Sequence, residues 1–167
     1  MLDGIVVRQL KRFPDERGFF TEILRNDWKD LLGEDTLAQA NLSVTYPSMV
    51  RAWHKHERGQ IDYFVAVKGA LKICAYDDVT KELDEIISTG DNIQIVRIPG
   101  HYWHGFKVVG NETAFHVYFV NRLYDYQKPD ERRRDWNDSS IIPQLINGKK
   151  DDPRVGKPWD WFYPPYK

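Results

Sequence analysis

The sequence predicts an all-β protein, built as an antiparallel sandwich or a small barrel. Short apolar or alternating runs recur along the chain with the two-residue period of a half-buried strand. Turn signals such as Lys68-Gly69, Asp77-Asp78 and Gly110-Asn111 separate these runs. Only one early segment shows the longer spacing of an amphipathic helix. Together these observations favour antiparallel β-structure over a helical or a parallel α/β fold.

The elements are expected in the following order. A strand at residues 5–7 is followed by a helix from about Asn26 or Asp27 to Leu32, which Gly33 can end. The next strands are predicted at residues 63–67, 71–76, 93–98 and 114–120. Residues 127–167 are rich in Pro, Lys, Arg and Asp but also carry several large rings. They predict an irregular, aromatic-rich C-terminal tail that packs on the sheet or on a second subunit.

Composition excludes several classes of protein. A length of 167 residues suits one domain, expected to span residues 1–167. The 24 Lys+Arg and 25 Asp+Glu residues nearly balance, which argues against a general nucleic-acid binder. Cys74 is the only cysteine, so an intramolecular disulfide and a cysteine zinc cluster are excluded. No apolar run approaches the roughly 18 residues of a membrane span, and the polar N-terminal residues do not resemble a signal peptide. We therefore expect a cytoplasmic protein that binds neither nucleic acid nor membrane.

Four histidines and a tyrosine fall in or beside predicted strands. His54 and His56 are two residues apart, so a strand directs both side chains to one face. His104 lies near the start of a later strand. His116 and Tyr118 share one face of the strand after that, opposite an apolar face. A single histidine is usually a structural residue, but this clustering predicts a pocket lined by titratable groups.

Two chemistries fit such a cluster, and the residues alone leave both open. The first is a metal site in which the imidazoles of His54, His56 and His104 are joined by an oxygen ligand from Gln60 or Asp62. The second is acid/base catalysis without a metal. In that case a histidine removes a proton from a carbon beside a carbonyl group, and a tyrosine returns one from the other face.

Six motifs in a fixed order resemble the dTDP-4-dehydrorhamnose 3,5-epimerase family. They are Phe13-Pro-Asp-Glu-Arg17-Gly18-Phe-Phe20-Thr-Glu22, Gln39-Ala-Asn41-Leu-Ser43, Arg51-Ala-Trp-His54, Gln60 with Gly69, Ile98-Pro99 with His104-Gly105-Phe106, and Trp136-Asn137-Asp138. The resemblance covers about residues 13 to 138, which is most of the chain. It implies a cupin-type double-stranded β-helix (jelly roll) with a short N-terminal helix.

The resemblance also implies an activity and a set of site residues. The activity is metal-independent epimerisation of a nucleotide-diphosphate 4-keto-6-deoxy sugar at C3, C5 or both, in deoxysugar biosynthesis. His54 would be the general base, Tyr118 the acid on the opposite face of the sugar, and Asp151 the carboxylate that orients the base. The residues implied to bind substrate are Arg17, Glu22, Gln39, Asn41, Arg51, Gln60, His104, Glu131 and Lys150. No metal and no cofactor are implied, and the expected assembly is a homodimer with exchange of strands near the N-terminus.

The chain departs from the family pattern inside the expected pocket. The family has a lysine two residues after the glutamine of the Gln60 strand, and here that position is Asp62. The missing cation would stabilise an enolate, and Lys72 or Lys68 is a candidate to replace it. Trp53 and Trp103 stand where the family has smaller residues, which predicts a reshaped pocket.

Three alternatives to an epimerase follow from these departures. The His54-Lys-His56 pair resembles the His-x-His of sugar-nucleotide 3,4-ketoisomerases, which move the carbonyl group of the same substrate class. A metal-binding cupin would use His54, His56 and His104. Asp62, finally, is compatible with a module that binds a sugar nucleotide without turning it over.

Overall fold

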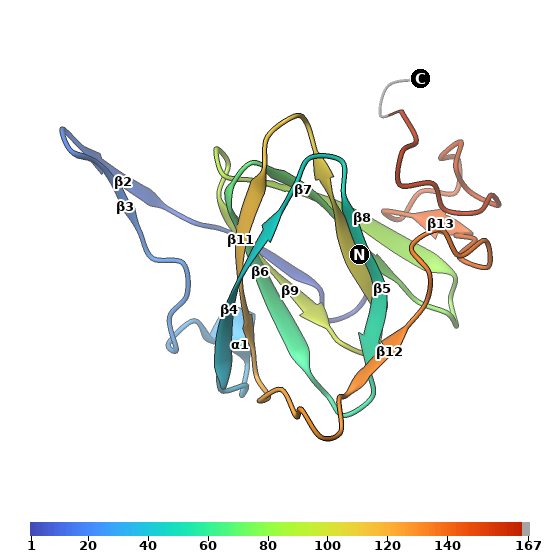
Figure 1. Ribbon diagram of the computed structural model, residues 1–167, viewed down its shortest axis with the longest axis horizontal. Helices are drawn as coiled ribbons and strands as arrows, with labels where there is room; N and C mark the ends of the chain where they lie inside the picture. The colour runs from blue at the N-terminus through green and yellow to red at the C-terminus, as the bar shows by residue number, and fades with distance from the viewer. Residues whose placement is uncertain (165–167) are drawn as a thin grey trace.

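The computed structural model describes residues 1–164 and shows two β-sheets that face each other (Figure 1). The five-stranded sheet has the order β1 (Val6–Gln9), β9 (Gln94–Pro99), β6 (Ile61–Lys68), β11 (Ala114–Val120) and β4 (Gln39–Thr45). The six-stranded sheet has the order β12 (Glu131–Arg133), β5 (Val50–His56), β10 (Trp103–Val109), β7 (Ala70–Tyr76), β8 (Glu82–Thr89) and β13 (Leu145–Ile146). Neighbouring strands pair antiparallel except β13, which runs parallel to β8. The predicted all-β fold is confirmed.

The helix α1 (Lys29–Leu32) is shorter than the sequence predicted. Trp28 occupies its N-cap position and supplies no side-chain hydrogen bond to the free backbone N–H groups. Gly33 ends it with a φ of 59°, as expected. Leu31 and Leu32 are buried against apolar side chains of β6 and β9, so packing on the sheet stabilises this single turn.

Both faces of the central strand β6 are buried, which explains its nearly continuous apolar sequence. Tyr63 and Val65 face the helix. Phe64 and Ala66 face the second sheet, in a core shared with β7 and β10. Strand β11 alternates in the same way, and this alternation turns two polar side chains, His116 and Tyr118, toward the space between the sheets.

The C-terminal tail packs on the outer face of the six-stranded sheet of its own chain (Figure 1). Trp159, Trp161 and Ile141 join a buried apolar cluster with Trp53 and other side chains of that sheet. The rings of Trp53 and Trp161 lie 4.8 Å apart, and Trp161 Nε1 donates to the carbonyl of Trp136 at 3.0 Å. The tail therefore backs the strand that carries His54.

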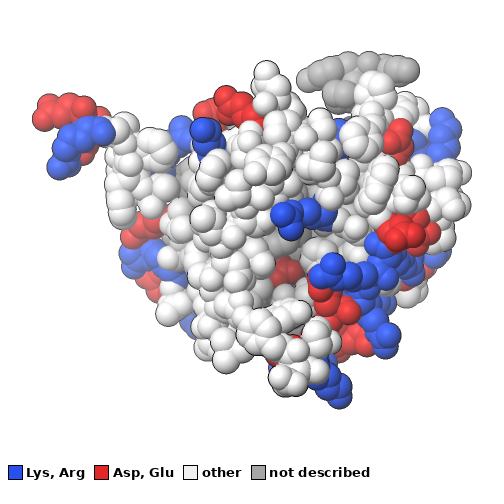
Figure 2. Space-filling view, viewed as in Figure 1, with Lys and Arg blue, Asp and Glu red and all other residues white. Residues whose placement is uncertain are grey.

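The hairpin of β2 (Arg12–Asp15) and β3 (Gly18–Thr21) extends away from both sheets (Figure 1). Phe19 and Phe20 on this hairpin are 54% and 64% exposed. Charged side chains gather at its tip, where Arg17 pairs with Asp15 at 2.6 Å (Figure 2). Within residues 1–164, no helix has the length and apolar composition needed to cross a lipid bilayer.

Candidate active site

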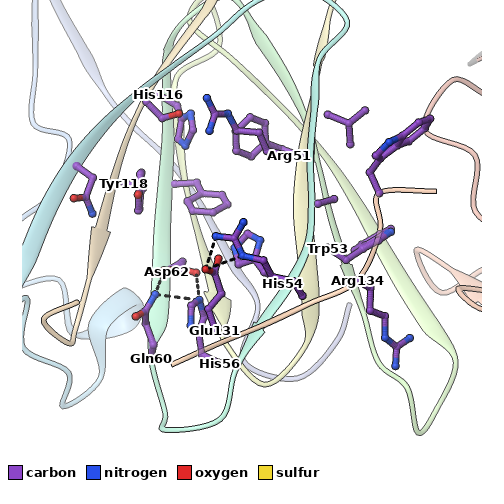
Figure 3. A pocket seen from close by; sticks show the side chains of 18 of the residues that line it. Arg51, Trp53, His54, His56, Gln60, Asp62, His116, Tyr118, Glu131 and Arg134 are labelled. Atoms are coloured by element: carbon purple, nitrogen blue, oxygen red, sulfur yellow. Dashed lines mark hydrogen bonds and ion pairs between the residues drawn. The ribbon is translucent and has the colours of Figure 1, made fainter. Parts of the chain in front are cut away.

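A cavity of about 1190 Å³ opens between the two sheets, and its mouth forms a recess near the centre of Figure 2. Strands β4, β6 and β11 form one wall, and β5 with the segment from β12 to Ser139 forms the other. The size suits a nucleotide-sugar ligand rather than a single small metabolite. Most of the side chains that line it are polar or charged, and they include Arg51, His54 and Tyr118 (Figure 3).

His54 and Tyr118 line this cavity from opposite sheets, His54 on β5 and Tyr118 on β11 (Figure 3). Burial is the main cause that lowers the pKa of His54 well below its ordinary value, and the neighbouring His104 adds to the effect. Its imidazole is therefore neutral at neutral pH, with a lone pair available for a proton. Burial raises the pKa of Tyr118, and nearby carboxylates add to the rise, so this phenol keeps its proton. The cavity thus has a neutral imidazole on one wall and a protonated phenol on the other.

Asp62 on β6 is bound by two of the histidines. Its Oδ2 lies 2.8 Å from His104 Nε2 and 3.5 Å from His56 Nε2. Gln60 Nε2 donates to Asp62 Oδ1 at 2.9 Å and also lies 3.1 Å from His56 Nε2. Burial by itself would raise the pKa of Asp62, but the hydrogen bonds from His104 and His56 outweigh it and hold the pKa well below its ordinary value. Asp62 is thus an ionised carboxylate that adjacent imidazoles stabilise.

Backbone carbonyls fix the orientation of these two imidazoles. His56 Nδ1 lies 2.9 Å from the carbonyl of Asp130, and His104 Nδ1 lies 2.9 Å from the carbonyl of Tyr102. A carbonyl oxygen only accepts hydrogen bonds, so both Nδ1 atoms are donors. Although burial opposes it, the hydrogen bond with Asp62 raises the pKa of His56.

His116 is a further polar group in the cavity wall. It is 1% exposed, and its Nδ1 has no hydrogen-bond partner within residues 1–164. Its ring stacks on Tyr118 and meets Phe106 edge-on, with centroids 5.5 and 4.6 Å apart. Burial, with a smaller contribution from Arg51, lowers the pKa of His116 to about 4. The sequence placed His116 beside Tyr118 but gave it no role.

Most of the residues predicted for the site lie around the cavity. Those that line it are His54, Gln39, Asn41, Arg51, Gln60, Tyr118 and Glu131. His104 is completely buried directly behind His54, with ring centroids 4.2 Å apart. Sequence reasoning missed Arg133, Arg134 and Trp136, which also line the cavity. The signal for the two arginines was the Arg132-Arg133-Arg134 run, and such runs usually lie on a solvated face. The signal for Trp136 was the Trp136-Asn137-Asp138 motif.

Four predicted residues lie outside the cavity of their own chain. Arg17 is exposed at the hairpin tip, and Glu22 pairs with Arg25 at 2.6 Å. Lys150 and Asp151 are exposed in the tail and are not among the residues that line the cavity. Asp62, rather than Asp151, is the carboxylate that the structure brings next to the histidines.

Neither lysine considered as a replacement cation lines the cavity. Lys72 lies on the outer face of β7, where its Nζ is 3.5 Å from Glu85 and 3.4 Å from the carbonyl of Trp161. Lys68 lies over the ring of Phe115. The strand alternation explains the position of Lys72, because its neighbours Leu71 and Ile73 fill the core between the sheets.

Comparison with known proteins identifies relatives over most of the chain. Residues 13–132 match the family model described as the polysaccharide biosynthesis C-terminal domain. The chain is 41% identical over 150 residues to the probable low-salt glycan biosynthesis epimerase Agl13 of Haloferax volcanii. The aligned residues make up 81% of this chain and 95% of that protein. It is 34% identical over 146 residues to the spore coat polysaccharide biosynthesis protein SpsL of Bacillus subtilis, covering 84% of this chain and 94% of that protein.

Solved structures show the same fold. The epimerase RmlC of Legionella pneumophila, determined in complex with dTDP-4-keto-L-rhamnose, superposes with a TM-score of 0.73 at 24% identity. The match covers 83% of this chain and 76% of that one. It confirms the jelly-roll architecture predicted from the motifs. The chain therefore belongs to the polysaccharide biosynthesis C-terminal domain family and is a sugar epimerase, which confirms its resemblance to the dTDP-4-dehydrorhamnose 3,5-epimerases.

Proposed function

We propose that this epimerase inverts C3, C5 or both in a nucleotide-diphosphate 4-keto-6-deoxy sugar, with His54 as the base and Tyr118 as the acid. The observation that carries the proposal is the position of these two side chains on facing walls of one cavity. A ligand bound between the walls presents one face to each. Removal of a proton from one face and return of a proton to the other inverts the carbon between them.

The proposed reaction proceeds through an enolate. Neutral His54 removes the proton on the carbon next to the ketone, and the electron pair of that C–H bond moves onto the ketone oxygen. Tyr118 then protonates the same carbon from the opposite side as the carbonyl re-forms. His54 is left protonated and Tyr118 deprotonated, and exchange of protons with water restores both. The rigid sheets hold base and acid in place, which removes the entropic cost of bringing them together.

The cavity also contains groups suited to the charges of such a substrate. Arg51, Arg133 and Arg134 line it, and a guanidinium group offers paired donors to phosphate oxygens. Arg51 is held in place through Nε, which donates to Thr45 Oγ1 at 3.1 Å. The hydrogen bonds from His104 and His56 stabilise the charge on Asp62, which lessens its repulsion of a developing enolate.

The direct test of the function is an exchange experiment in D₂O with a panel of nucleotide-linked 4-keto sugars. NMR should show deuterium at C3 or C5 only when the enzyme is present, followed by the inverted product. A product whose ketone carbon has moved would indicate a 3,4-ketoisomerase instead. Absence of exchange with every sugar would contradict the proposal.

We also propose that the chain forms a homodimer in which the β2–β3 hairpin reaches a second copy. Two observations support this assembly. Phe19 and Phe20 are exposed on the projecting hairpin, and Leu42 and Val44 are exposed on the edge strand β4. Arg17 lies too far out to serve its own cavity and would reach that of the partner. A single domain over residues 1–167 and a cytoplasmic location stay predictions.

Replacement of Phe20 by aspartate is expected to convert the dimer to a monomer, because the partner would have to bury a charge. Sedimentation velocity at several protein concentrations measures the change. The matched control is Val79→Asp, at an apolar residue that is 87% exposed in the turn between β7 and β8. This control should remain dimeric. A wild-type protein that sediments as a monomer at every concentration would contradict the assembly.

A further inference from the structure

Four side chains at the inner end of the cavity have the composition of a transition-metal site. We call His54, His56, His104 and Asp62 the histidine–aspartate cluster. One ligand atom from each of these residues lies within 4.8 Å of the other three. Three imidazoles with one carboxylate suit ions such as Zn²⁺, Co²⁺ and Ni²⁺, whereas Mg²⁺ and Ca²⁺ prefer oxygen ligands alone.

Two of the histidines are already oriented as metal ligands. A metal-bound imidazole usually donates its second ring N–H to a carbonyl or a carboxylate, which fixes the tautomer and the direction of the ring. His56 and His104 both do this through Nδ1, to the carbonyls of Asp130 and Tyr102. Both Nε2 atoms consequently point toward the same carboxylate oxygen of Asp62.

The distances around Asp62 are close to those in a coordination shell. Its Oδ2 is 2.8 Å from His104 Nε2 and 3.5 Å from His56 Nε2. Ligand atoms held about 2.0–2.1 Å from a zinc ion are roughly 3 Å apart. Gln60 donates to the other oxygen, Oδ1, at 2.9 Å, so Oδ2 is the oxygen left to face an ion.

Burial distinguishes this cluster from a chance group of surface residues. His56, Asp62 and His104 are 8%, 2% and 0% exposed. An ion that enters along the cavity would meet a largely dehydrated site with three imidazoles and one carboxylate. The proton now between His104 Nε2 and Asp62 Oδ2 would leave to solvent as the ion takes its place.

We propose that the histidine–aspartate cluster binds one divalent transition-metal ion and that the bound ion stops proton transfer by occupying the lone pair of His54. His54 lines the cavity together with His56 and Asp62, and its ring lies 4.2 Å from that of the buried His104. An imidazole whose lone pair binds a metal cannot accept a proton from substrate. The ion is therefore an inhibitor rather than a cofactor. This second half of the proposal rests on the proposed function, whereas the metal site does not.

The binding test uses full-length protein freed of metal with EDTA. Titration with Co²⁺ should give visible d–d absorption that saturates at one ion per chain, and Zn²⁺ should displace it. His54→Asn and Asp62→Asn should abolish this absorption. Gln60→Leu should weaken binding by about 10- to 100-fold, because it removes a hydrogen bond to a ligand. The matched control is His116→Asn, at a buried cavity histidine outside the cluster, and its Co²⁺ binding should equal that of the wild type.

The activity test compares solvent-deuterium exchange by the metal-free enzyme before and after one equivalent of Zn²⁺. Exchange should be lost and should return on addition of EDTA. Absence of Co²⁺ binding, or equal binding by the wild type and the cluster variants, overturns the proposal. Faster exchange with the ion bound also overturns it, because the ion would then be a cofactor. Co²⁺ binding to a metal-free enzyme that exchanges no sugar leaves the metal site standing and contradicts the proposed function. Circular dichroism of each metal-free variant checks that a loss of binding is not a loss of folding.

Discussion

Replacement of His54 by asparagine is expected to lower the rates of both solvent exchange and epimerisation by about 10²- to 10⁴-fold, the usual contribution of a general base. Asparagine is similar in size but has no basic nitrogen. His54 is only partly buried, so the substitution should leave the fold intact. Both rates can be followed by NMR in D₂O with the same sugar. His101→Asn is the matched control, because His101 is exposed and does not line the cavity.

Two outcomes would count against the role of His54. Exchange at the wild-type rate in His54→Asn would move the base elsewhere in the cavity, with His56 as the next candidate. An equal loss of activity in His101→Asn would show that the effect is not specific to the cavity. The expected result is a large loss in the first variant and none in the second.

Tyr118→Phe is expected to separate exchange from inversion. The base can still remove the proton and return a deuteron to the same face, so deuterium should enter the sugar with retained configuration. Inversion should fall by about 10²- to 10⁴-fold, because no acid remains on the opposite wall. The substitution removes one oxygen from a half-buried ring and preserves its stacking on His116. The ratio of deuterated starting sugar to inverted product is the quantity to measure.

This ratio also tests the geometry on which the mechanism depends. If Tyr118→Phe inverted the sugar at the wild-type rate, another group would have to protonate the second face. A parallel loss of exchange and inversion would instead give Tyr118 a role in binding or in enolate formation. Only a selective loss of inversion agrees with an acid that acts from the wall opposite His54.

Strands with strong apolar alternation were predictable from the sequence, and strands with mixed composition were not. Residues 114–120 were predicted with the bounds that the structure shows. Strand β8 was missed because its sequence, Glu-Leu-Asp-Glu-Ile-Ile-Ser-Thr, alternates charge with apolar residues and buries Asp84 as well as Leu83. The short strands β12 and β13 were missed because their pairing partners, β5 and β8, are distant in sequence.

The candidate site was predictable where its chemistry lies on one strand and unpredictable where it depends on contacts between strands. The spacing of His54 and His56, and of His116 and Tyr118, placed each pair on one face. The motif order supplied the position of Arg51 at the cavity. The sequence could not show that Asp62 would lie between His56 and His104, because that contact joins three strands. The sequence offered Asp62 only as one of two possible oxygen ligands beside the histidines, or as a carboxylate where the family has a lysine.

The packing of Trp161 against Trp53 has a consequence for the order in which a newly made chain becomes active. Trp53 directly precedes His54, and Trp161 covers it from behind. The ribosome makes Trp161 after the last strand of the two sheets, β13. The strand that carries His54 therefore gains this support only when the tryptophan-rich end of the chain has been made.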